Sequence, residues 1–326
     1  MDTVFVSGTL LGDALEVLSE SFEVVQDEGG VTSDAFARCA DRVRGIVALI
    51  TDRIDDRVLE RTPRLTVVAN VAVGVDNIDL AACAARNVIV TNTPDVLTEA
   101  TADVAFGLLI DAARRITEGD RLIRAGRWEK WTPSFHLGRR VHGMKLGIVG
   151  FGRIGKAVAR RARGFGMHVG YTQRCREPEA IERALGATYV ASLDELCASS
   201  DAISIHVPLT PETRYLFTAE RLARMRPGSI LVNTARGPIV DEAALAHALE
   251  HGPLAAAGLD VFEDEPRVHP ALLARENAVL APHIGSADRP TREAMASTAA
   301  ANVIRVLRGE PALTPVTDGQ NARGAR

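Results

Sequence analysis

The chain has 326 residues, of which 46% are hydrophobic and 25% charged, so it can form roughly two packed domains and extensive disorder is excluded. Its 42 acidic residues outnumber its 38 basic ones, and the resulting net charge of −4 excludes the global basic field of a nucleic-acid-binding protein. Only Lys130, Lys145 and Lys156 are lysines, which leaves 38 − 3 = 35 arginines that can still bind anions locally.

The cysteine pattern and the hydropathy indicate a cytoplasmic protein. Four cysteines lie far apart without a C-x-x-C pair, which disfavours a zinc site or a disulfide framework and fits a reducing compartment. The longest apolar stretch, 65–75, is far below the ~20 residues that span a bilayer, and no N-terminal signal segment is visible. We expect no membrane partner, no nucleic-acid partner and no metal.

The first part of the chain alternates short β-branched runs with helical spacing. Strands are predicted at 4–6, 46–50, 67–71 and 88–90. Continuous apolar strands separated by helices are typical of a parallel sheet covered on both faces. One long helix is predicted over 98–124.

A second series of alternations begins at Lys145. Strands are predicted at 146–149, 169–171, 202–205, 230–232, 256–259 and 278–280, and helices at 153–164, 193–199, 219–225, 242–251 and 289–307. The pattern predicts an α/β protein of two doubly wound, Rossmann-like parallel-sheet domains, with the last helix returning to the first domain.

A glycine-rich turn, G-F-G-R-I-G at 150–155, lies between a predicted strand and a predicted helix. Gly150 permits a tight turn, Gly152 lets the backbone approach a pyrophosphate, and Gly155 allows close helix–strand packing. The turn therefore predicts a dinucleotide site, with the phosphates at the N-terminus of the helix.

The end of the next strand indicates which dinucleotide is bound. An NAD site places an acidic residue ~20 positions after the turn, whereas this chain has no acid until Glu177 and carries Arg174 and Arg176 before it. Arginines attract a 2′-phosphate through charge-assisted hydrogen bonds, so the sequence predicts NADPH as the preferred cofactor, with NADH possible. The alternative is that these arginines belong to a solvated loop.

Three later segments place polar residues at predicted strand ends, namely N-T-A-R-G at 233–237, G-L-D-V-F-E-D-E-P at 258–266 and P-H-I-G-S at 282–286. Because the carboxyl ends of parallel strands meet at one edge of a sheet, these segments should converge on the edge that carries the glycine-rich turn.

With these segments and V-G-V-D-N-I-D at 73–79, the chain resembles the D-isomer-specific 2-hydroxyacid dehydrogenases from its first strand to Pro315. Within that family it is most similar to the glyoxylate/hydroxypyruvate reductases, notably at N-T-P-D-V-L-T, 92–98. The resemblance implies a substrate-binding domain over 1–94, a dinucleotide-binding domain over 95–286, and a C-terminal helix within 287–326 that returns to the substrate domain.

The resemblance also implies a catalytic set of Arg236, Glu265 and His283. His283 would protonate the keto oxygen, Glu265 would orient the imidazole and keep it protonated, and Arg236 would hold the substrate carboxylate. The backbone N–H groups of Val73 and Gly74 would bind the other carboxylate oxygen. Glu263 and Asp264 compete with Glu265 on composition alone, and Glu265 is preferred because it precedes the proline of the family pattern.

The cofactor contacts that the resemblance implies lie on strand ends and on the first residues of the long helix. They are Thr101, Gly150, Phe151, Gly152, Arg153, Ile154, Gly155, Gln173, Arg174, Cys175, Val207, Pro208, Thr213, Thr234, Ala235, Arg236, Asp260, His283 and Gly285. Asp260 is expected to be a supporting acid near the nicotinamide or Arg236. A homodimer is implied as well, with the 98–124 helix and the 128–135 loop at the contact and Trp131 or Phe135 approaching the partner's pocket.

The expected reaction is reduction of a small 2-keto acid, glyoxylate or hydroxypyruvate, to the D-2-hydroxy acid. Reduction of 2-ketogluconate or hydroxyphenylpyruvate stays open, because pocket size depends on loops. Phosphite dehydrogenases have a lysine where this chain has Val73, and phosphoglycerate dehydrogenases often add a C-terminal regulatory domain, so both are disfavoured. A non-enzymatic NAD(P)-sensing corepressor is disfavoured by the complete catalytic set.

Overall fold

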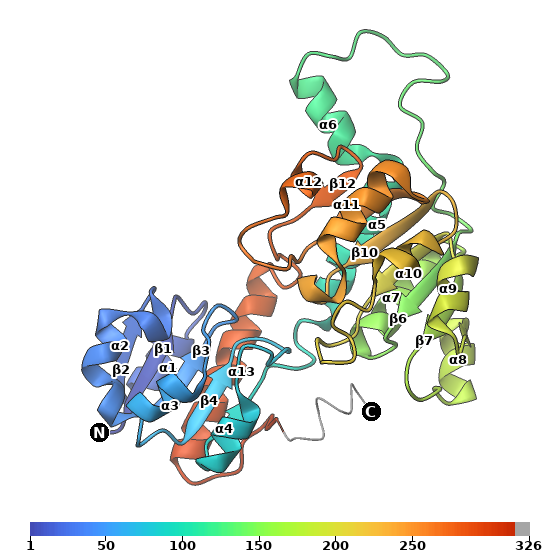
Figure 1. Ribbon diagram of the computed structural model, residues 1–326. Helices are drawn as coiled ribbons and strands as arrows, with labels where there is room; N and C mark the ends of the chain where they lie inside the picture. The colour runs from blue at the N-terminus through green and yellow to red at the C-terminus, as the bar shows by residue number, and fades with distance from the viewer. Residues whose placement is uncertain (317–326) are drawn as a thin grey trace. The chain divides into compact units, whose positions relative to one another are not determined.

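The structure is a computed structural model that describes residues 1–316 (Figure 1). This part of the chain divides into two compact units, one made of Met1–Leu97 with residues 286–316 and the other of Thr98–Gly285. Of the predicted C-terminal segment 287–326, residues 317–326 lie outside the described part.

The first unit is built on a five-stranded parallel sheet in the order β2-β1-β3-β4-β5. Its strands are β1 (Thr3–Ser7), β2 (Glu23–Asp27), β3 (Val43–Ala48), β4 (Val67–Asn70) and β5 (Ile89–Thr91). This is the flavodoxin-like order of a doubly wound sheet. The central strands β1 and β4 are buried along their whole length, which explains why they appear in the sequence as uninterrupted apolar runs.

Helices cover both faces of this sheet. They are α1 (Ala14–Ser19), α2 (Asp34–Cys39), α3 (Asp56–Arg61), α4 (Leu80–Ala85) and α13 (Arg289–Leu307). Asp288 caps α13 by accepting a hydrogen bond from the N–H of Thr291. The buried face of α13 packs on β3 and β4, and Val303 lies so close to Gly45 that a Cβ there would be 3.0 Å from its methyl group. The C-terminal helix thus completes the first unit, as predicted.

The second unit is built on a seven-stranded parallel sheet in the order β12-β11-β10-β9-β6-β7-β8. Its strands are β6 (Lys145–Val149), β7 (His168–Thr172), β8 (Ala187–Tyr189), β9 (Ala202–Ile205), β10 (Ser229–Asn233), β11 (Leu254–Leu259) and β12 (Ala278–Leu280). The strand order reverses between β6 and β9. In open α/β sheets, ligands bind outside the carboxyl ends of the strands at such a switch point.

Eight helices belong to the second unit within the described residues. They are α5 (Thr98–Arg114), α6 (Ile116–Arg124), α7 (Arg153–Gly164), α8 (Glu179–Leu185), α9 (Leu193–Ser199), α10 (Ala219–Ala223), α11 (Glu242–His251) and α12 (Pro270–Leu273). Helices α5 and α7 share one apolar core with the sheet, and α9, α10 and α11 share another. The two parallel sheets, of five and seven strands, confirm the predicted α/β class with two Rossmann-like units. In residues 1–316, no helix is long and apolar enough to cross a membrane.

The prediction of one helix over 98–124 is wrong. Arg115 has a left-handed backbone (φ 56°) that separates α5 from α6. Two hydrogen bonds hold the break. The Asp111 carboxylate accepts the N–H of Thr117 (2.8 Å), and the His136 ring, 21 residues away, bonds to the Arg115 carbonyl (2.8 Å). Helix α6 has no buried residue and, with the segment that follows it, extends away from the sheet (Figure 1).

The edge strands β2 and β8 were not predicted from the sequence. Strand β2 reads EVVQD and is only half-buried, and β8 has three residues. Edge strands pair on one side only, so neither needs the long apolar run that marks a central strand.

Candidate active site

The predicted site residues of the second unit converge at the carboxyl edge of the seven-stranded sheet. The glycine-rich turn follows β6, the segment that begins at His206 follows β9, and the segment that begins at Thr234 follows β10. Asp260 follows β11 and His283 comes three residues after β12. Because all these strands are parallel, the segments lie at one edge.

The glycine-rich turn is shaped by close backbone contacts. Gly150 has a φ of 91°, and a Cβ there would lie 2.6 Å from the carbonyl oxygen of His206. A Cβ at Gly155 would lie 2.3 Å from the carbonyl oxygen of Gly150. Gly152 is the N-cap of α7 and has no side chain, so the helix begins without a side-chain cap. A backbone turn of this shape before a helix N-terminus fits a pyrophosphate.

The side chains of Phe151 and Ile154, in the glycine-rich turn, pack against the core. The Phe151 side chain is fully buried and stacks on Tyr171 with 4.1 Å between ring centroids, so only its backbone remains at the turn. Its N–H donates to Oε1 of Gln173 (3.2 Å). The Ile154 side chain is half-buried against the core.

His283 and Glu265 form a hydrogen-bonded pair. Nδ1 of His283 lies 2.7 Å from Oε2 of Glu265, and Oε1 of Glu265 accepts the N–H of Phe262 (3.0 Å). Burial favours the neutral carboxyl, but the bonds from His283 and Phe262 outweigh it and hold the pKa of Glu265 below its ordinary value. His283 has a left-handed backbone (φ 52°), a strained conformation that occurs often at functional sites.

Asp260 fixes the loop that carries His283. Its buried carboxylate accepts the N–H groups of Ile284 and Gly285, both at 2.7 Å, and its carbonyl oxygen accepts the N–H of His283 (2.9 Å). Burial raises the pKa of Asp260, and the two N–H bonds oppose that rise. Both carboxylate oxygens are engaged by backbone, so Asp260 positions the 283–285 loop.

The three neighbouring acids at 263–265 have different partners. Glu263 accepts the N–H of Glu242 (2.8 Å) and the hydroxyl of Tyr215 (3.0 Å). Asp264 forms an exposed ion pair with Arg267. Of the three, Glu265 is the one that is hydrogen-bonded to His283, which separates it from the two competitors.

Arg236 lies in a turn that side chains hold rigid. Asn233 donates from Nδ2 to the Arg236 carbonyl (2.8 Å) and accepts the N–H of Ala235 (3.0 Å). A Cβ at Gly237 would lie 1.9 Å from the carbonyl carbon of Phe262, so this turn is pressed against the segment that leads to Glu265. The positive charge of Arg236 contributes to the lowered pKa of Glu265.

The remaining predicted cofactor residues of the second unit lie near this edge. Thr101 is buried in α5, with its side chain 3.4 Å from where a Cβ on Gly285 would be. Thr213 donates to the carbonyl of Pro208 (2.6 Å) and closes the turn after Val207. The buried hydroxyl of Thr234 has no hydrogen-bond partner within the described residues.

At the end of β7, the two arginines are not equivalent. Arg176 forms a bidentate ion pair with Glu182 (2.9 and 2.7 Å), and that carboxylate also accepts the hydroxyl of Tyr171. The charge of Arg176 is therefore already compensated. Arg174 and Cys175 are exposed at the tip of the loop.

In the first unit, the 73–74 backbone is held from its carbonyl side. Asn92 donates to the Val73 carbonyl (2.9 Å) and Asn70 to the Gly74 carbonyl (2.8 Å). These two bonds fix the backbone of residues 73–74, whose N–H groups follow one another along the chain. Two adjacent N–H groups of this kind suit a carboxylate oxygen.

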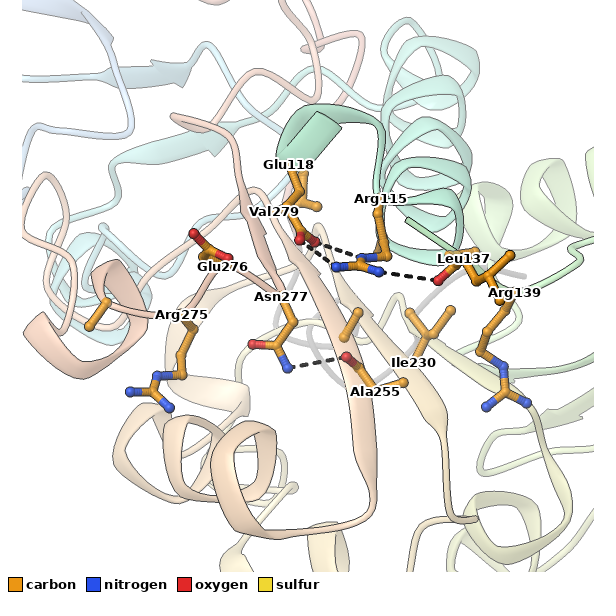
Figure 2. A pocket seen from close by; sticks show the side chains of 15 residues that line it. Arg115, Glu118, Leu137, Arg139, Ile230, Ala255, Arg275, Glu276, Asn277 and Val279 are labelled. Atoms are coloured by element: carbon orange, nitrogen blue, oxygen red, sulfur yellow. Dashed lines mark hydrogen bonds and ion pairs between the residues drawn. The ribbon is translucent and has the colours of Figure 1, made fainter. Parts of the chain in front are cut away.

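A separate cavity of about 530 Å³ lies at the opposite edge of the seven-stranded sheet (Figure 2). Ile230, Ala255 and Asn277 line it near the amino ends of β10, β11 and β12, and Arg115 reaches across it between Glu118 and Leu137. None of the predicted catalytic or cofactor residues lines it.

Comparisons with known proteins assign the chain to a family. Residues 106–285 match the model of the D-isomer specific 2-hydroxyacid dehydrogenase, NAD binding domain. The chain is 47% identical over 313 residues to a glyoxylate reductase of Thermococcus onnurineus (94% of this chain, 93% of the relative) and 48% identical over 312 residues to one of Korarchaeum cryptofilum (94% and 93%). It is similar to the crystal structure of an NADPH-dependent glyoxylate/hydroxypyruvate reductase from Sinorhizobium meliloti in complex with NADP and malonate (TM-score 0.85, 37% identity, 97% of this chain and 96% of that chain). The chain belongs to the D-isomer-specific 2-hydroxyacid dehydrogenase family of oxidoreductases, which confirms the resemblance found in the sequence.

Proposed function

We propose that this protein is a 2-keto acid reductase that converts glyoxylate or hydroxypyruvate to the 2-hydroxy acid, of D configuration where the product is chiral. The observation that carries the proposal is the 2.7 Å His283–Glu265 pair beside the Arg236 turn, at the edge that carries the glycine-rich turn. Glyoxylate reductases at 47% and 48% identity support the same substrate class.

The second unit is the proposed dinucleotide-binding domain. Gly150, Gly152 and Gly155 with the N-terminus of α7 would hold the pyrophosphate, and the other predicted contacts would surround the remainder of the cofactor. When bound there, a reduced nicotinamide would supply the hydride for reduction of a carbonyl group.

The proposed proton donor is His283. With Nδ1 fixed by Glu265, Nε2 of the imidazolium would give its proton to the keto oxygen as negative charge develops there. His283 would then be neutral and regain a proton from solvent. Arg236 would hold the substrate carboxylate in its planar fork. In the proposed substrate-binding domain, the N–H groups of Val73 and Gly74 would donate to a carboxylate oxygen of the substrate.

NADPH is the proposed preferred cofactor. No acid occupies the first positions after β7, and the exposed Arg174 stands there with its charge available to a 2′-phosphate. A related S. meliloti reductase is NADPH-dependent.

Steady-state rates of nicotinamide oxidation test these proposals. Glyoxylate, hydroxypyruvate, pyruvate, 2-ketogluconate and hydroxyphenylpyruvate are each offered with NADPH and with NADH. We expect the highest kcat/KM with glyoxylate or hydroxypyruvate and NADPH. A higher kcat/KM for a larger keto acid would overturn the substrate assignment, and a higher value with NADH would overturn the cofactor assignment.

We also propose a homodimer that forms through the second unit. Helix α6 buries none of its side chains, and the segment after it exposes large apolar groups, with Trp131 74% and Trp128 52% exposed. Contact with a second copy would cover them. Light scattering during size-exclusion chromatography should give twice the mass of one chain. The substitution Trp131→Glu should shift the measured mass toward that of the monomer. A monomeric wild-type protein would contradict the proposal.

A further inference from the structure

An ion pair between Lys156 and Glu177 lies beside the proposed 2′-phosphate position. Lys156 is in the first turn of α7, directly after the glycine-rich turn, and its Nζ lies 3.0 Å from Oε2 of Glu177. The pair is mostly buried, with 24% of the Lys156 side chain and 13% of the Glu177 side chain exposed. Screening by water is weaker for such a pair than for a surface ion pair.

Glu177 is held on its other oxygen as well. Gln173 donates from Nε2 to Oε1 of Glu177 (3.0 Å) and to the Cys175 carbonyl (2.7 Å), while its Oε1 accepts the N–H of Phe151. The Glu177 N–H donates to the hydroxyl of Tyr171 (2.9 Å). The carboxylate is thus fixed at the base of the 173–177 loop and linked to the glycine-rich turn.

The other charges of this loop show what Lys156 contributes. Arg176 is compensated by Glu182. The pKa of the exposed Glu212 is lowered first by its bonds to Thr210 and to its own backbone, and the charge of Arg174 adds to them. Arg174 therefore remains an exposed cation of this loop. Without Lys156, the negative charge of Glu177 would be uncompensated. That charge would then repel a 2′-phosphate bound at the loop.

We propose that Lys156 is a specificity-determining residue for the cofactor, which neutralises Glu177 and so allows Arg174 to select a 2′-phosphate. This inference rests on the proposed dinucleotide site and refines the proposed NADPH preference. Lys156 acts through Glu177, as a positioning residue, and the sign of its effect is the same whichever cofactor the wild-type protein prefers.

The test measures dissociation constants for NADPH and NADH by nicotinamide fluorescence, which needs no turnover. Lys156→Met should weaken NADPH relative to NADH by about tenfold, and the effect should shrink at high salt. Adding Glu177→Gln to Lys156→Met should restore the wild-type ratio, because no charge then remains to be neutralised. Lys145→Met is the matched control, since it removes the same charge from the amino end of β6 and should leave the ratio unchanged.

An unchanged ratio in Lys156→Met overturns the inference, and so does a double variant as impaired as the single one, which would show a structural role. Retained NADH binding verifies that the variant folds. Wild-type preference for NADH would overturn the proposed cofactor, whereas the change in the ratio on substitution would still decide the role of Lys156.

Discussion

Replacing Glu265 by glutamine tests the proposed proton donor most directly. The substitution preserves size, and the new amide oxygen can still accept the N–H of Phe262, so the loss is confined to the charged hydrogen bond at 2.7 Å from Nδ1 of His283. A hydrogen bond to a charged group contributes about 1.5–3 kcal/mol. At about 1.4 kcal/mol per decade of rate, kcat with glyoxylate and NADPH should fall between about tenfold and about 150-fold.

The adjacent acid supplies a matched control. Asp264→Asn removes the same charge one residue away, where the carboxylate only pairs with an exposed arginine, so kcat should not change. Both variants should bind NADPH as the wild-type protein does, which fluorescence titration verifies. Wild-type kcat in Glu265→Gln, or an equal loss in Asp264→Asn, would refute the assignment of Glu265 to His283.

Other variants test the remaining parts of the site and the fold. His283→Ala should lower kcat by about 10²–10⁴ in the same assay without changing the circular dichroism spectrum, and near-normal turnover would remove it from the mechanism. Arg236→Lys should impair kcat/KM severely, because an ammonium cannot reproduce the two parallel hydrogen bonds of the guanidinium. The pKa of Glu182 is held at about 2, against an ordinary 4.5, by its bonds to Arg176 and Tyr171, so the ionised carboxylate stabilises the fold above pH 4.5 and this contribution is lost as the pH falls toward 2. The melting temperature of Glu182→Gln should accordingly change less with pH in that window than the wild-type melting temperature does. An equal pH dependence in the two proteins would show that the pair of Glu182 with Arg176 does not stabilise the fold. Gly237→Ala should lower the free energy of unfolding by about 1–3 kcal/mol in urea titrations, since its Cβ meets the Phe262 backbone.

The parts of the fold that the sequence predicted are those that burial alone determines. Central strands such as β9 and β10 are buried on both faces, so they appear as apolar runs that the alternation of strands and helices places in a parallel sheet. The break at Arg115 has no such local signal. It depends on Asp111 reaching Thr117 and on His136 reaching the Arg115 carbonyl from 21 residues away.

The site shows the same division. The strand-end segments predicted which residues meet at the sheet edge, because parallel topology brings carboxyl ends together. The sequence does not predict which charged side chains form ion pairs. Arg176 pairs with Glu182, and Lys156 with Glu177, only in the folded chain. In a chain with 35 arginines, composition cannot separate a compensated cation from one that faces a ligand.

Asp260 and Glu265 lie at the same edge of the sheet, but their pKa values shift in opposite directions. Asp260 is fully buried, whereas the Glu265 side chain is 33% exposed, and loss of solvation acts to raise the pKa of each. Asp260 is bonded by backbone N–H groups and its pKa stays raised, whereas Glu265 is bonded by an imidazole and has its pKa lowered. Environments that push the pKa values of two acids apart are characteristic of sites where acids have different tasks. A carboxylate that remains ionised against a histidine can stabilise the imidazolium that gives up a proton, while one saturated by backbone can only hold the loop. The opposite shifts therefore connect the geometry of the 283–285 loop to the chemistry proposed for His283.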